Sequence, residues 1–304
     1  MKIGLFTVGT GKMLGGALLK AVAINAERLG VATLWVPEHV VLIDKYASKY
    51  PYTQDGRLPA PTNAPIFDPF IALATMAAVT TKIRLATGIC LVPEHNPVVL
   101  AKVIATLDFL SAGRTVLGVG IGWLEEEFEA IGVPWERRAH RVREYIEAMR
   151  ALWAGDVVSY SGEFVNFHGV QSYPKPVNNK RVPVWFGGHA DVTLKRTARW
   201  GDGWMMLSHQ MGPEAETAFA TLRRYVEDAG RDPSTIGLEV WVSTGAGGPA
   251  DWRKEFEYWK SVGVTHVTVN STFNRGPHRR IKGRTMADHL AAMKQYYEAV
   301  ADLL

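Results

Sequence analysis

Short β-branched runs alternate along this chain with longer segments whose apolar residues recur at helical spacing. This alternation indicates repeated strand–helix units and a parallel sheet. The candidate strands occupy 2–8, 32–38, 83–90, 114–122, 182–188, 203–208, 236–242 and 264–270, and the helical patterns 16–30, 68–81, 96–113, 140–155, 213–230 and 286–304. Eight parallel strands with right-handed crossovers close most economically into a barrel. We therefore predict an α/β fold, a (β/α)8 TIM barrel with insertions, as one domain over 1–304.

Several of these helical segments have end signals of their own. Gly30, Gly113 and Gly230 stand just past predicted helix ends, and Asp68 followed by Pro69 is typical of a helix start.

Composition excludes several classes of function. With 304 residues, 47% hydrophobic and 21% charged, the chain is neither disordered nor fibrous. The single cysteine, Cys90, excludes an internal disulfide framework and a cysteine-rich zinc site. No apolar run is long enough to span a membrane, and no Lys/Arg run with interleaved aromatics indicates nucleic-acid binding. We expect a cytoplasmic protein that acts on a small-molecule substrate.

Two long connections follow strands, at 39–67 and 271–285. Ordinary strand-to-helix loops have about 2–6 residues. Both long connections leave the carboxyl ends of strands, where barrel enzymes build their sites, so we expect them to be functional. The segment 156–181 alternates like a small hairpin after a helix and is interpreted as a structural appendage or contact surface.

Strand 114–122 carries Gly118, Gly120 and Gly122 on one face, which predicts a bulky neighbour there. A dinucleotide-binding fingerprint would need glycine at the position of Trp123, so that interpretation fails. The simpler interpretation, favoured from the sequence alone, is that small residues relieve crowding where a helix or an inner layer packs tightly.

The stretch "WFGGHAD" ends strand 182–188 and enters a helix. The backbone amides of Gly187, Gly188, His189 and Ala190 can then bind an anion at the helix N-terminus. The alternative is an ordinary turn with Asp191 as the N-cap.

His39 follows strand 32–38 at the catalytic end of the predicted barrel, and histidine titrates near neutral pH. It is a candidate proton-transfer residue, with a solvated histidine as the alternative. Glu38 either orients it or is a surface acid. The remaining histidines considered show no metal-ligand spacing, so no metal is predicted: His95, His140, His209 and His266.

Four ordered blocks resemble the luciferase-like flavin and deazaflavin oxidoreductase family, most closely its branch that uses coenzyme F420. The blocks are "ATGICLVPEHNPVVLAKVIATLDFLSAGR", "LGVGIGWLEEEFEAIGVPWERR", "GEFVNF" and "PVWFGGHADVTLKRTARWGDGW". The resemblance implies a bulge with a cis peptide at Gly88–Ile89 against the cofactor ring, which Gly122 and Trp123 also border. It further implies that His39 is the active-site histidine. We also expect Glu38 and His39 to be among the cofactor-binding residues.

The resemblance also makes Gly187, Gly188, His189 and Ala190 the phosphate-binding turn. Relatives often have serine where this chain has Ala190, so the resemblance leaves the phosphate to backbone amides and to nearby arginines, namely Arg137, Arg138 or Arg141. Sugar-phosphate dehydrogenases of the family carry glutamate where this chain has Trp123, which argues against that substrate. A basic group in the last loop either meets the cofactor tail or is solvated: Arg275, Arg279, Arg280, Lys282 and Arg284.

The function implied by the resemblance is hydride transfer between C5 of F420 and an organic substrate held under the 39–67 loop. The aromatic residues of that loop either indicate an apolar or ring-containing substrate or anchor the loop: Tyr46, Tyr50, Tyr52 and Phe67. His39 would supply or remove the accompanying proton. Two alternatives remain open: a reduced-FMN monooxygenase on the same barrel, and a non-catalytic flavin- or deazaflavin-binding protein. A homodimer and a flavin or F420 reductase partner are also left open.

Overall fold

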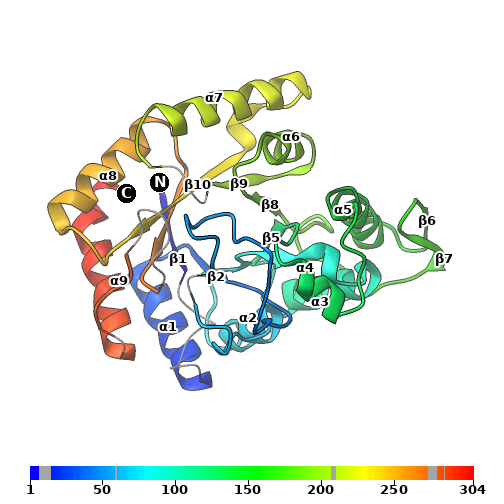
Figure 1. Ribbon diagram of the computed structural model, residues 1–304, viewed down its shortest axis with the longest axis horizontal. Helices are drawn as coiled ribbons and strands as arrows, with labels where there is room; N and C mark the ends of the chain where they lie inside the picture. Colours follow the sequence, from blue (N-terminus) through cyan, green and yellow to red (C-terminus); the bar gives the residue numbers. More distant parts are fainter. Residues whose placement is uncertain (7–14, 59, 207–209, 273–278, 284) are drawn as a thin grey trace.

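The computed structural model describes residues 1–6, 15–58, 60–206, 210–272, 279–283 and 285–304. Its centre is a closed barrel of eight parallel strands (Figure 1). Around the barrel these are β1 (Lys2–Phe6), β2 (Thr33–Val36), β3 (Arg84–Thr87), β5 (Thr115–Gly120), β8 (Val184–Gly187), β9 (Gly203–Met206), β10 (Gly237–Ser243) and β11 (His266–Asn270). The ring closes because β3 pairs with β2 on one side and β5 on the other, and β1 pairs with β11. The predicted barrel is confirmed. Seven of the predicted strand ranges contain one of these strands, and the range 236–242 covers β10 except for its last residue, Ser243.

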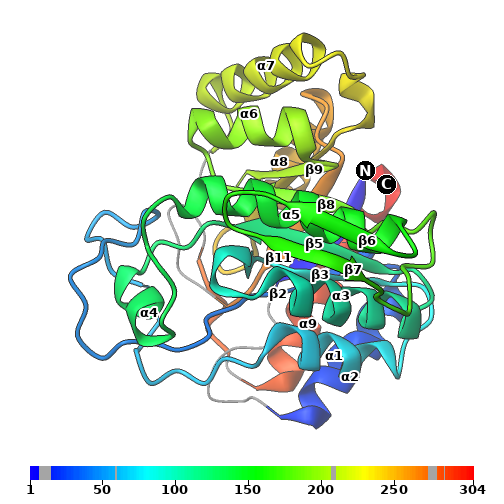
Figure 2. The ribbon, with the colours of Figure 1, turned by 90° about the vertical axis from the view of Figure 1, so that its right-hand side faces the viewer.

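Helices follow the strands and cover the outside of the barrel (Figures 1 and 2). They are α1 (Gly16–Leu29), α2 (Pro69–Ala77), α3 (Pro97–Leu110), α5 (Arg138–Ala154), α6 (Asp191–Trp200), α7 (Pro213–Asp228), α8 (Pro249–Ser261) and α9 (Met286–Val300). The short helix α4 (Glu125–Ala130) lies at one end of the barrel instead. The predicted start of α2 is confirmed, because Asp68 accepts a hydrogen bond from the amide of Ile71 and Pro69 opens the helix. Gly30 ends α1 with φ of 87°, as its position predicted. No described helix is long and apolar enough to cross a membrane.

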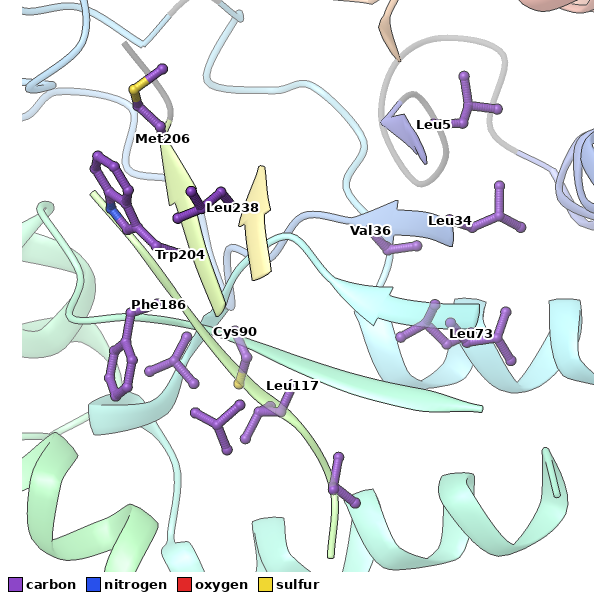
Figure 3. Close-up of a cluster of buried hydrophobic side chains, with 14 of the residues drawn as sticks. Leu5, Leu34, Val36, Leu73, Cys90, Leu117, Phe186, Trp204, Met206 and Leu238 are labelled. Carbon is purple, nitrogen blue, oxygen red and sulfur yellow. The ribbon is translucent and has the colours of Figure 1, made fainter. Parts of the chain in front are cut away.

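Two hydrophobic layers hold the barrel together. The outer layer lies between strands and helices, and Figure 3 shows part of it, from Leu34 and Leu73 to Trp204 and Leu238. The inner layer fills the barrel interior with Phe6, Trp35, Ala86, Val116, Trp185, Met205 and Trp241. Because large aromatic side chains occupy the interior, chemistry is restricted to a barrel end.

The predicted hairpin is also present. Strands β6 (Val158–Ser161) and β7 (Asn166–Val170) pair antiparallel. Glu144 of α5 accepts hydrogen bonds from the amides of Glu163, Phe164 and Val165, which fixes the hairpin turn to that helix. The hairpin therefore acts as an appendage of α5.

The long connection from β2 to α2 and the short helix α4 lie together beyond one end of the barrel, away from the two chain termini (Figure 2). This is the end to which the carboxyl termini of the parallel strands lead. It is the expected location of a functional site.

Candidate functional site

Strand β3 is interrupted after Thr87, and pairing with β5 resumes at β4 (Cys90–Leu91). The Gly88–Ile89 peptide between them is cis, as the family resemblance implied. A Cβ atom built on Gly88 would lie 3.0 Å from Cβ of Trp35 and 3.4 Å from the ring of Phe6. The neighbours that require glycine at position 88 are therefore side chains of the barrel interior.

The glycines of β5 accommodate this interruption. A Cβ atom on Gly118 would collide with the carbonyl oxygen of Thr87, and one on Gly120 would collide with the side chain of Ile89. The simpler sequence interpretation, that small residues relieve crowding, is thus confirmed for these two positions. Gly122 lies beyond the strand with φ of 79°, a conformation that favours glycine.

His39 and Glu127 form a hydrogen-bonded pair at the carboxyl end of β2. Nδ1 of His39 lies 2.7 Å from Oε2 of Glu127, and the side chains are 11% and 0% exposed. The other Glu127 oxygen accepts a hydrogen bond from the amide of Val41 at 3.0 Å. Glu127 therefore fixes the imidazole through Nδ1 and leaves Nε2 as the nitrogen that can meet a ligand.

Glu127 was missed by sequence reasoning. It stands in the run Glu125–Glu127 directly after the glycine-rich end of β5, and that placement at a strand end was the available signal. Which of three consecutive acids faces His39 depends on the first turn of α4, which the sequence did not define.

Glu38 does not have either of the roles considered for it beside His39. It is 5% exposed, so it is not a surface acid. Its carboxylate accepts hydrogen bonds from the Leu91 amide at 2.6 Å and lies 3.1 Å from Nε2 of His95, while Glu127 is the acid that orients His39. Burial acts to lower the pKa of His95, but the hydrogen bond and charge of Glu38 outweigh it and raise that pKa. A cofactor contact by Glu38 stays a prediction.

Glu38, Cys90 and His95 each bring one potential metal-ligand atom within 4.8 Å of the others. Complete burial raises the pKa of the Cys90 thiol well above its usual value, and the charge of Glu38 acts in the same direction. A thiol that keeps its proton is a poor metal ligand. We interpret the group as a buried ion pair beside an uncharged thiol.

Four aromatic residues, here called the aromatic cluster, cover the space between His39 and the β8 turn: Tyr46, Tyr50, Tyr52 and Trp123. The ring of Trp123 lies 6.0 Å from that of His39 and 5.1 Å from that of Tyr50. The ring of Tyr52 lies 5.4 Å from that of Tyr50 and 5.4 Å from that of His189. These contacts join the connections after β2, β5 and β8, so the predicted residues His39, Trp123 and His189 come together.

The long loop that carries three of these aromatic residues is held by α4. The carboxylate of Glu126 accepts hydrogen bonds from the amides of Ala47 at 2.6 Å and Ser48 at 3.2 Å. Slight burial acts to raise the pKa of Glu126, but hydrogen bonds from Ser48 and the loop amides lower it to about 2. The loop from 39 to 67 is therefore held against α4 by hydrogen bonds to the ionised carboxylate of Glu126.

At the turn after β8, Ala190 is the N-cap residue of α6 and supplies no side-chain hydrogen bond. The alternative that Asp191 is the N-cap is wrong: Asp191 is the first helical residue, and its carboxylate contacts Lys195 at 2.7 Å and the Tyr225 hydroxyl at 2.6 Å. The first amides of the helix therefore have no side-chain cap, which fits the predicted anion site. Gly188 has φ of 121°, and a Cβ on Gly187 would lie 3.3 Å from Ile89.

The structure places the predicted arginines against the protein itself. Arg141 is 5% exposed, and its guanidinium donates to the carbonyls of Pro134 and Glu136. Arg137 pairs with Glu163, and Arg138 lies over the ring of Trp135. These contacts give Arg141 a structural role, and its contact with a cofactor phosphate stays a prediction.

The basic group after β11 is only partly described. Arg279, Arg280 and Lys282 lie in described segments, and the Arg279 amide donates to the Ser243 hydroxyl at 3.0 Å. Arg275 and Arg284, like His209, lie outside the described residues. Whether this group meets a cofactor tail stays a prediction.

Comparison with known proteins gives two relatives and one solved structure of note. An uncharacterised protein of Mycobacterium tuberculosis is 41% identical over 250 residues, which cover 81% of this chain and 84% of the relative. An F420-dependent glucose-6-phosphate dehydrogenase of Kineococcus radiotolerans is 28% identical over 277 residues, covering 88% and 74%. The crystal structure of a monooxygenase from Streptomyces bottropensis matches with a TM-score of 0.77 at 20% identity, covering 100% of this chain and 99% of that one.

The Streptomyces structure supports the barrel fold. At 20% identity it supports no statement about function. The family model described as luciferase-like monooxygenase matches residues 1–301, nearly the whole chain. The chain therefore belongs to the luciferase-like monooxygenase family of oxidoreductases.

Proposed function

We propose that this chain is an F420-dependent oxidoreductase that acts on an organic, ring-containing substrate. The observation that carries the proposal is the His39–Glu127 pair, set at one side of the aromatic cluster with the uncapped turn of α6 at the other. The F420-dependent relative from Kineococcus supports this choice of cofactor. When bound, F420 supplies a two-electron hydride donor or acceptor at C5.

The residues present fit such a cofactor at two places. Ile89, half-buried on top of the inner aromatic layer, and Gly122 would border its ring. The backbone from Gly187 to Ala190 would hold its phosphate, because the first amides of α6 have no side-chain cap. The Asp191 carboxylate beside them is neutralised by Lys195 and so opposes an anion less.

His39 would hold or release the proton that accompanies reduction or oxidation of the substrate, at Nε2. Its partner Glu127 is fully buried and accepts from Nδ1 or pairs with the imidazolium. A carboxylate in this position stabilises the protonated ring and fixes its orientation, so that the proton moves at one defined atom. The aromatic cluster would pack on the substrate and exclude water.

A reduced-FMN monooxygenase is the second candidate, because the Streptomyces protein with the same fold is a monooxygenase. The two functions differ in their need for oxygen. In the F420-dependent reaction, hydride passes only between the cofactor and the organic substrate. In the FMN-dependent reaction, the substrate gains an oxygen atom.

The test is oxidation of reduced F420 and reduced FMN by a panel of ring-containing ketones, with and without oxygen. We expect ketone-dependent oxidation of F420 that persists without oxygen. His39→Asn should slow it about 10²-fold, within the usual contribution of general acid–base catalysis, and leave F420 affinity unchanged. The matched control is His140→Asn at an exposed histidine. Turnover that requires FMN and oxygen would favour the monooxygenase instead.

A further inference from the structure

Tyr52 reaches from the long loop after β2 onto the interior of the barrel. It is partly buried, and like Ile89 it packs on the inner aromatic layer that contains Trp35 and Trp185. Ile89 follows the end of β3, so this contact lies at the carboxyl end of the barrel. A side chain of the loop therefore covers the barrel interior at the place where the cis peptide is found.

The hydroxyl end of Tyr52 lies at the turn after β8. Its Oη atom is 3.7 Å from a Cβ atom built on Gly188, and its ring is 5.4 Å from that of His189. The preceding residue, Gly187, is close to Ile89, because a Cβ atom built on it would lie 3.3 Å from that side chain. Tyr52 therefore extends from the surface beside Ile89 to the turn whose amides lack a side-chain cap.

These two places are the ones that the proposed function gives to the cofactor. Its ring would lie against Ile89, and its phosphate would bind the backbone from Gly187 to Ala190. A molecule that spans both places passes Gly188, where the Tyr52 side chain lies. Packed atoms cannot share this space, so Tyr52 in this position and the bound cofactor exclude each other.

The turn that carries Tyr52 is closed by its own backbone. The amide of Tyr50 donates to the carbonyl of Gly56 at 2.8 Å, and the amide of Gly56 donates to the carbonyl of Thr53 at 3.3 Å. These bonds lie within the turn, so they persist when the turn moves. The loop just before it is held by Glu126, which accepts from the amide of Ser48. The turn 50–56 is therefore able to move as a unit beside a fixed anchor.

We propose that Tyr52 occupies the cofactor site of the free protein, and that the cofactor binds only after the turn 50–56 has moved this side chain away. The inference rests on the proposed function, since it takes the places of the F420 ring and phosphate as the ones that Tyr52 covers. Such a contact lowers the apparent affinity by the fraction of molecules in the open state. Truncating Tyr52 should therefore tighten binding, whereas truncating a residue that holds the cofactor weakens it.

The equilibrium test is fluorescence titration of the full chain with F420, and separately with FMN, at neutral pH. If Tyr52 covers the site in nine-tenths of the free molecules, Tyr52→Ala should lower the Kd about tenfold. Tyr52→Phe keeps the ring that fills the site, so its Kd should stay close to that of the wild type. The matched control is Gln54→Ala at an exposed residue of the same turn, which should also follow the wild type. Circular dichroism establishes that each variant is folded.

The kinetic test is stopped-flow mixing with excess cofactor. In the wild type the observed rate of binding should level off at high cofactor concentration, because opening of the turn then limits it. In Tyr52→Ala the observed rate should rise linearly over the same concentrations. A linear dependence of the same slope in both proteins would overturn the inference.

The outcomes separate the two proposals. A Kd that is unchanged or raised in Tyr52→Ala, with cofactor bound by the wild type, overturns the role of Tyr52 and leaves the proposed function standing. Binding of neither cofactor to the wild type or to Tyr52→Ala overturns both. Tighter binding by Tyr52→Ala, with Tyr52→Phe and Gln54→Ala like the wild type, supports the inference.

Discussion

At the scale of single residues, Glu127 determines how His39 is presented. Replacing Glu127 with Gln keeps the shape of the side chain but removes the charge that pairs with a protonated imidazole. We expect kcat/KM to fall about 10²-fold, with little change in cofactor affinity. The matched control is Glu129→Gln at an exposed acid of the same short helix. Because the pair acts as one unit, His39→Asn combined with Glu127→Gln should cost no more than His39→Asn alone; additive losses would contradict the pairing.

The sequence predicted special backbone positions more successfully than it predicted which side chains form hydrogen bonds with each other. The cis bond at Gly88–Ile89 and the location of His39 at a strand end followed from local pattern and resemblance, and the structure agrees with both. The partner of His39 is 88 residues away, and no local pattern identifies it. The same limit applied to Glu38, whose hydrogen bonds come from Leu91 and His95 across a separate part of the chain.

At the scale of elements, α4 and the 39–67 loop form one unit through Glu126. The folded-state pKa of Glu126, about 2, lies below its usual value of 4.5. The stabilisation of the docked loop is therefore present above pH 4.5 and is lost as the pH falls towards 2. Glu126→Ala should release the loop at neutral pH, and hydrogen exchange at the amides of Ala47 and Ser48 should speed up. Glu129→Ala should leave this exchange unchanged; unchanged exchange in Glu126→Ala would contradict the docking.

Helices and strands whose apolar residues recur at a regular spacing were predictable from the sequence. Elements that depend on tertiary contacts were not. The eight strands and six helical ranges followed from alternating apolar patterns. Helix α4 has six residues, four of them acidic, and was not predicted because a segment that short has no apolar period. Helix α8 was also missed, although Trp252, Phe256 and Trp259 lie at helical spacing and are buried. The polar residues between them hid that period.

At the scale of the whole molecule, the barrel interior contains an acid whose protonation affects stability. Glu239 of β10 is fully buried, and burial raises its pKa to about 8, with the Thr268 hydroxyl acting in the opposite direction. A folded-state pKa above the usual 4.5 means that the free energy of unfolding falls as the pH rises from about 4.5 to 8. Glu239→Gln should remove the contribution of this residue to the decline, which is at most about 1.4 kcal/mol per pH unit. Urea unfolding of this variant across pH 5–9 measures the effect, with Glu227→Gln on the surface as control; an identical pH dependence in Glu239→Gln and wild type would contradict it.

The closed barrel was the most predictable feature of all, because eight strand–helix repeats have few other ways to bury their apolar faces. The identity of the cofactor is the least predictable, because the same fold and family serve more than one. Side-by-side fluorescence titration of the wild-type protein with F420 and FMN at neutral pH tests the central claim most directly. The account predicts saturable binding of F420, tighter than that of FMN. Saturable binding of FMN without binding of F420 would contradict it.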